Sequence, residues 1–179
     1  MDEPAATPSS AAPPGARMLT IKWGAPQLTW RNLTVQGPRL VAGGVLVLDA
    51  CHFTGCKADR GGALRQTGGV VSATDCSFVE NEAQEGGAVL ISGGQATFET
   101  CRFERNTAGA LGGALFLSQK AHTLLADTRV QHNQVLGGCG GGVACDSCSV
   151  VLHNTKLSHN LAVHGGGICA GTGATVILQ

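Results

Sequence analysis

Residues 78–87 read FVENEAQEGG, and the rest of the chain repeats this arrangement. Residues 103–113 read FERNTAGALGG and residues 53–62 read FTGCKADRGG, while looser copies are VQHNQVLGGCGGG at 130–142 and LSHNLAVHGGG at 157–167. Each copy has a large apolar residue, two variable residues, Asn (Cys in the 53–62 copy), a polar stretch and Gly-Gly. The large apolar residues fall at positions 53, 78, 103, 130 and 157, so the steps are 25, 25, 27 and 27 residues. A period of this length is typical of solenoids and propellers.

Three extended segments separated by turns fill each period. One follows the glycines, as in GGAVLIS, and a longer run ends at the apolar mark, as in QATFETCRF. These runs are rich in β-formers, and no segment has a helical period. A single turn of about 25 residues cannot bury its own apolar side chains, whereas turns stacked about 4.8 Å apart can. We therefore expect an all-β, parallel β-helix of about six coils with three short strands per coil; a propeller blade needs more residues and antiparallel strands.

Stacked coils predict columns of equivalent side chains. The first inward column holds Phe53, Phe78, Phe103, Val130 and Leu157, and the second holds Cys51, Cys76, Cys101, Thr128 and Thr155. At the following turn we expect an Asn column whose amides bond their own backbone and the neighbouring coil, and whose members tolerate left-handed φ: Asn81, Asn106, Asn133 and Asn160. The Gly-Gly pairs should supply positive φ and close backbone approach at the next corner.

Composition sets the domain boundaries and excludes some partners. Residues 1–18 are Pro/Ala/Ser-rich and are expected to be disordered, and residues 19–179 form the repeat domain. The net charge is zero, with 13 % charged residues, which gives no basis for binding nucleic acid or an anionic membrane. No apolar run reaches the ~20 residues of a transmembrane helix. The N-terminus lacks a signal peptide, and the last coil stops at Gln179 inside an expected strand, so we expect a piece of a longer protein or a truncated gene product.

The paired signals F-x-x-N and G-G-A-[ILV] resemble the repeats of the chlamydial polymorphic outer-membrane proteins. They are FVEN with GGAV, FERN with GGAL, and the looser VQHN with GGGV and LSHN with GGGI. The resemblance covers roughly residues 50–179. It implies the right-handed β-helix of the pectin-lyase-like superfamily and an extracellular or cell-surface, outer-membrane-associated adhesin.

The eight cysteines are the first candidates for chemistry. We expect Cys51, Cys76 and Cys101 to pack as buried thiols, although adjacent coils also place their Cα atoms within disulfide range. Cys145 and Cys148 form a CxxC, with Cys139 and Cys169 near in sequence. Zinc is disfavoured because stacked strands arrange residues in rows, and a disulfide across the turn is expected if the protein is secreted.

Histidine and carboxylate patterns give no catalytic or metal site. His132 and His159 share a repeat position and should be outward neighbours, as a solvated polar column rather than a metal pair. Asp75 and Asp127 share a column, but Thr100 separates them, and we expect no Arg or Lys column beside them. A glycoside hydrolase or lyase needs clustered acids on one face. We therefore predict a non-enzyme with no catalytic, cofactor or metal residues.

The expected function is adhesion or scaffolding by a surface or secreted module that binds an unknown protein or glycan surface. Contacts should lie on the exposed sheet faces or on the variable loops, which are residues 57–60, 82–85, 107–111, 134–139 and 161–164. The alternative is a carbohydrate-active β-helix, a hydrolase or lyase whose catalytic coils are missing from this chain.

Overall fold

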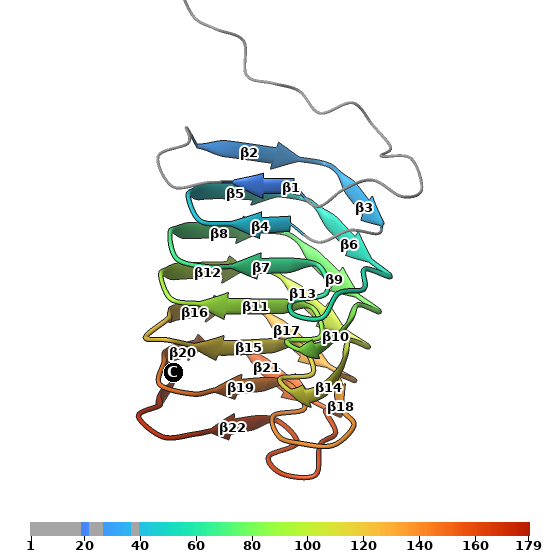
Figure 1. The fold of residues 1–179 in the computed structure, drawn as a ribbon, viewed down its shortest axis with the longest axis vertical. Helices are drawn as coiled ribbons and strands as arrows, with labels where there is room; N and C mark the ends of the chain where they lie inside the picture. The colour runs from blue at the N-terminus through green and yellow to red at the C-terminus, as the bar shows by residue number, and fades with distance from the viewer. Residues whose placement is uncertain (1–18, 22–26, 37–39) are drawn as a thin grey trace, which may run out of the picture.

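The chain is a stack of parallel strands wound into a solenoid, whose turns follow one another along the vertical axis of Figure 1. The computed structural model describes residues 19–21, 27–36 and 40–179, and the segment 1–18 expected to be disordered lies outside them. Residues 40–158 form five consecutive turns, each of which places a strand in all three long sheets. Residues 19–36 and 168–178 add strands above and below. The prediction of an all-β parallel β-helix is confirmed.

Three sheets form the walls, and every strand pair in them is parallel and in register. Sheet A contains β1 (Leu19–Ile21), β4 (Leu40–Ala42), β7 (Leu64–Gln66), β11 (Val89–Ser92), β15 (Leu115–Ser118), β19 (Val143–Cys145) and β22 (Ile168–Ala170). Sheet B contains β2 (Leu28–Arg31), β5 (Val45–Asp49), β8 (Val70–Thr74), β12 (Gln95–Glu99), β16 (His122–Ala126), β20 (Ser149–His153) and β23 (Thr175–Leu178). Sheet C contains β3 (Thr34–Gln36), β6 (His52–Thr54), β9 (Ser77–Val79), β13 (Arg102–Glu104), β17 (Arg129–Gln131) and β21 (Lys156–Ser158).

A fourth, short sheet corrects the expectation of three strands per coil. Sheet D consists of β10 (Glu82–Glu85), β14 (Thr107–Leu111) and β18 (Gln134–Val135), segments that were expected to be loops. It lies beside sheet A, at the right of Figure 1. The segments consist mostly of small or polar residues with few strong β-formers, but their backbone N–H and C=O groups pair with the turns above and below.

The interior is filled by the predicted apolar column. The rings of Phe53 and Phe78 stack with centroids 4.9 Å apart, and those of Phe78 and Phe103 with centroids 4.8 Å apart. Phe98 meets Phe103 edge to face at 5.3 Å. All four rings are fully buried. The ring spacing matches the distance between paired strands, so each turn is completed only by its neighbours.

The second predicted column is buried from Cys51 to Thr128 and half-buried at Thr155, and hydrogen bonds to the preceding turn hold it. The Cys101 thiol donates to the carbonyl of Ala73 at 3.4 Å, and the Thr128 hydroxyl lies 3.2 Å from the carbonyl oxygen of Phe98. Cys51, Cys76 and Cys101 are free thiols, as expected. Cysteine and threonine are interchangeable here because each carries a short side chain with one donor.

The Asn column forms a continuous ladder of amides, but not with the predicted backbone conformation. The amide nitrogen of Asn106 donates to the Phe78 carbonyl and to Oδ1 of Asn133, both at 2.9 Å. Both bonds recur at Asn81 and Asn133, and Asn160 donates to the carbonyl of Val130. The expectation of left-handed φ at Asn is wrong. The preceding residue adopts that conformation in each turn, with φ between 52° and 56° at Glu80, Arg105, His132 and His159. This bend directs the Asn side chain into the solenoid interior, where its amide bonds the neighbouring turns.

The Gly-Gly corners behave as predicted. The first glycine of each pair has positive φ, as at Gly86 with φ 62°. A Cβ on the second glycine, Gly87, would collide with the carbonyl oxygens of Gly113 and Thr107. Only glycine allows consecutive turns to approach this closely.

Candidate binding surface

The variable loops line up into a single ridge. The loop ridge consists of residues 57–60, 82–85, 107–111, 134–139 and 161–164. Sheet D holds its middle, and isolated bridges extend the pairing to the flanking turns. One outward column of the ridge changes chemistry at every turn: Lys57, Glu82, Thr107, Gln134 and Leu161. The ridge is therefore a rigid backbone that carries different side chains on each rung.

Ion pairs link the upper turns of the loop ridge. The Lys57 ammonium lies 2.6 Å from the Glu82 carboxylate, and the Arg60 guanidinium lies 3.0 Å from that of Glu85. A hollow of about 130 Å³ lies on the ridge, bordered by Lys57, Glu82 and Leu136. Exposed ion pairs contribute little stability, so these residues are free to vary.

The outer face of sheet A carries an apolar column that was not predicted from the sequence. Leu90, Phe116 and Ala144 stack in register and are buried, although they point away from the main core. Leu111 of the loop ridge packs against them. A signal was available, because VLIS and LFLS are apolar without alternation, as in strands covered on both faces. A shallow groove of about 380 Å³ runs over Leu90 and Phe116.

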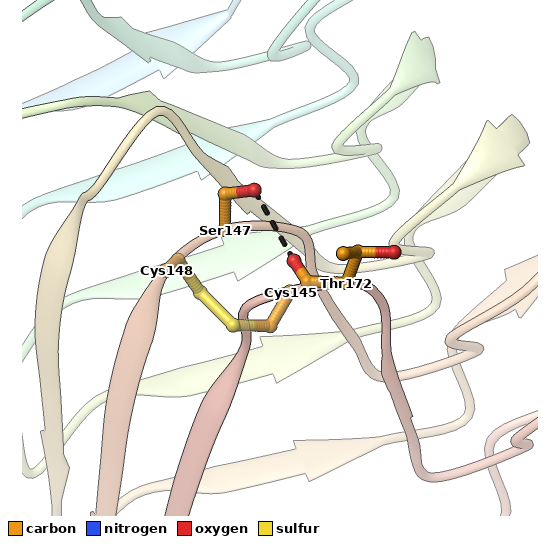
Figure 2. The surroundings of a disulfide bond; sticks show 4 residues. All are labelled: Cys145, Ser147, Cys148 and Thr172. Atoms are coloured by element: carbon orange, nitrogen blue, oxygen red, sulfur yellow. Dashed lines mark hydrogen bonds between the residues drawn. A yellow bond between two sulfur atoms is a disulfide. The ribbon is translucent and has the colours of Figure 1, made fainter.

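Two disulfides lie in the lower turns. Cys145 and Cys148 close the corner between β19 and β20, with Cα atoms 5.7 Å apart, so the expected disulfide across this turn is present. Figure 2 shows this bond beside the hydrogen bond from the Ser147 hydroxyl to the Thr172 carbonyl at 3.2 Å. In earlier turns the same corner is made by Gly68-Gly69 and Gly93-Gly94, which have positive φ.

The second disulfide joins the loop ridge to sheet A. Cys139 lies directly below Leu111 in the ridge, and Cys169 lies directly below Ala144 in sheet A. Their Cα atoms are 5.7 Å apart. Cys139 thus forms a covalent bond to sheet A at the ridge position where Leu111, one turn earlier, packs against the apolar column of sheet A. The sequence analysis did not pair these two residues, because the pairing depends on how the ridge folds back over sheet A.

The buried thiols of Cys51 and Cys76 remain protonated at neutral pH and are therefore poorly reactive. Hydrogen bonding with Cys101 and burial raise the pKa of the Cys76 thiol to about 12. Hydrogen bonding with Cys76 and burial raise the pKa of Cys51 well above its usual range. Because the thiolate is the nucleophile and the metal ligand, these residues are structural.

The two predicted histidine neighbours are in contact. The rings of His132 and His159 stack with centroids 4.8 Å apart, and both residues are exposed. No group of three or more His, Cys, Asp or Glu side chains in the described part of the chain is arranged to hold a metal ion.

Asp75 and Asp127 sit at equivalent corners, two turns apart, with Thr100 between them. All three adopt left-handed φ, from 49° to 54°. Asp tolerates this conformation better than most residues, which gives these acids a conformational role. Asp127 also accepts a hydrogen bond from the amide of Asn154.

The expectation that no basic column lies beside these acids is wrong. The register of sheet C places Arg102, Arg129 and Lys156 directly above one another. All three side chains point outward and are exposed. We name Arg102, Arg129 and Lys156 the basic column. Sequence inspection missed it because the strands RFE, RVQ and KLS look unrelated until their register is known.

Comparison with known proteins agrees with this architecture. Residues 23–179 match the family described as right handed beta helix region, and the chain belongs to this family. No curated protein and no solved structure matches the chain. Within the described residues, no helix is long and apolar enough to cross a membrane.

Proposed function

We propose that the chain is a non-catalytic β-helix module of a secreted or cell-surface protein that binds a protein or glycan surface. The observation that carries this proposal is the contrast between columns. The Phe and Asn columns keep one chemistry through several turns, whereas the outward column of the loop ridge changes at every rung. A rigid frame with variable side chains suits recognition.

The location is proposed on separate grounds. Two disulfides favour an oxidising compartment such as the cell exterior. The F-x-x-N and G-G-A-[ILV] signals, similar to those of polymorphic outer-membrane proteins, support an adhesin-like role. A carbohydrate-active role is less well supported, because Asp75 and Asp127 lie about two rungs, or roughly 10 Å, apart with Thr100 between them.

The test compares binding with turnover. The purified chain is labelled, and its binding to cell surfaces, matrix proteins and a glycan array is measured. Polysaccharides are incubated with the same preparation while reducing ends and unsaturated products are monitored. We expect saturable binding without product.

A matched pair of variants locates the contact. Glu82→Ser with Gln134→Ser alters the loop ridge, and Gln95→Ser with Thr175→Ser alters the exposed face of sheet B. The ridge variant should weaken binding to a protein partner and the sheet B variant should not. Catalytic release of sugar products, or no binding to any surface, would overturn the proposal.

A further inference from the structure

We propose that the basic column on sheet C binds a linear, densely sulfated glycan that runs along the solenoid axis. This inference rests on the proposed function and names the partner class of one face. Arg102, Arg129 and Lys156 are exposed and lie one above another on consecutive turns. Strand spacing sets their backbone separation at about 4.8 Å.

Arg102 is paired with Glu104, whereas Arg129 and Lys156 are less neutralised by the protein than the cations of the loop ridge. On the loop ridge, Lys57 and Arg60 each face a carboxylate of the next turn, at 2.6 and 3.0 Å. In the part of the chain that the structure describes, no carboxylate lies within 4.0 Å of the Arg129 or Lys156 cation. Like charges stacked in register repel each other, and an external anion relieves that repulsion.

Charged and aromatic side chains border the basic column. Glu104 is only 6 % exposed, and its carboxylate lies 2.9 Å from the Arg102 guanidinium and 3.0 Å from that of Arg105. One buried acid thus holds two arginines. Asp127, the acid nearest to Arg129 in sequence, is engaged by Asn154. The stacked rings of His132 and His159 occupy the same turn position as Arg105, with Glu80 one turn above Arg105.

The spacing of the cations in the basic column favours a sulfated glycan over a nucleic acid. A glycan advances by roughly one rung per sugar, so an anionic group on nearly every sugar is needed to meet every cation. In a duplex each strand advances about 3.4 Å along the helix axis per phosphate and winds around that axis, so a straight column of cations cannot follow one strand. Single-stranded nucleic acid is bound by rows of exposed aromatic rings on which successive bases stack. The outward residues of β13, β17 and β21 are charged or polar, and the neighbouring rings of His132 and His159 stack on each other rather than standing apart to receive bases. Arginine binds sulfate and phosphate groups bidentately.

The test uses fluorescein-labelled heparin oligosaccharide and fluorescence anisotropy from 50 to about 300 mM NaCl. Arg129→Ser with Lys156→Ser should weaken binding at least about tenfold and lower the slope of log Kd against log salt by about two. Lys57→Ser with Arg60→Ser removes the same charges from the loop ridge and should leave binding unchanged. Arg129→Lys with Lys156→Arg should keep binding, and circular dichroism melts report the folding of each variant.

Several outcomes would overturn the inference. They are no heparin binding at 50 mM NaCl, equal losses in the two serine pairs, or tighter binding of duplex DNA, inorganic polyphosphate or hyaluronan than of heparin. If binding to cells or matrix proteins persists while heparin is not bound, the proposed function stands and this inference fails. If heparin binds but sugar products are released, the proposed function fails instead.

Discussion

Asn106 and Asn133 are joined by two hydrogen bonds to one oxygen atom. The backbone N–H and the side-chain amide of Asn106 both donate to Oδ1 of Asn133, each at 2.9 Å. Asn81, Asn106 and Asn133 each accept from the turn before and donate to the turns on both sides, whereas Asn160 accepts from and donates to the turn before it. The column therefore transmits the register of one corner to the next.

Asn106→Ala is expected to lower the free energy of unfolding by about 2–4 kcal/mol. The substitution leaves the backbone N–H of Asn81 without its side-chain acceptor and removes the amide donor to the carbonyl of Phe78, in the buried interior. Urea denaturation measures the change. Asn160→Ala, at a half-buried position in the last Asn turn, is the control and should cost about half as much. Equal losses would show that the ladder does not stabilise the interior turns in this way.

Alkaline pH should destabilise the fold through the cysteine column. The pKa of Cys76 is raised from 9.0 to about 12 in the folded chain, so the folded state keeps a proton that the unfolded state loses. The contribution to stability is complete below pH 9 and is lost as the pH rises from 9 toward 12, by about 1 kcal/mol per pH unit for each such thiol. Urea titrations at several pH values measure this slope. Cys76→Thr, which copies the residue type of Thr128, should give a flatter profile, and an unchanged profile would contradict the assignment.

Gly87→Ala should prevent close approach of two turns. A Cβ at this position would lie 2.6 Å from the Thr107 carbonyl oxygen and would also strike the carbonyl of Gly113. We expect a loss of about 3 kcal/mol or more, measured as thermal stability and soluble yield. Gly167→Ala is the matched control because a Cβ there has no neighbour within 4 Å. Similar melting temperatures for the two variants would refute the steric argument.

The two disulfides should differ in their contribution. Cys139–Cys169 closes a separation of 30 residues and Cys145–Cys148 one of 3. Loop entropy predicts that Cys139→Ser with Cys169→Ser costs about 3–4 kcal/mol, and Cys145→Ser with Cys148→Ser about 1–2 kcal/mol. Urea unfolding in the absence of reductant ranks the variants. The reverse order would mean that local strain relief or packing, rather than loop closure, dominates.

The columns could be predicted from the sequence because the solenoid converts spacing along the chain into position. Phe78 and Phe103 are 25 residues apart and stack directly, so counting alone places them together. The buried thiols follow for the same reason. Sheet D could not be predicted, because EAQE has no β propensity and its pairing depends on the neighbouring turn.

Other features depend on details that residue type does not reveal. The left-handed residue before each Asn is Glu, Arg or His, and of these only His is enriched in that conformation. The Cys139–Cys169 bond depends on how the loop ridge returns over sheet A. The basic column becomes visible only when Arg102, Arg129 and Lys156 are aligned by register, since their spacing of 27 residues is hidden among unlike neighbours.

The direction of the backbone hydrogen bonds determines how the solenoid responds to mechanical load. These bonds run from turn to turn, so a pull on the two ends opens them in series rather than all together. Each released turn of about 25 residues adds roughly 80 Å of extended chain. The Cys139–Cys169 bond encloses one such turn, so the residues of this turn cannot extend until the disulfide is reduced. Under tension the chain would therefore lengthen in steps of one turn, while the turn closed by the disulfide stays folded on itself.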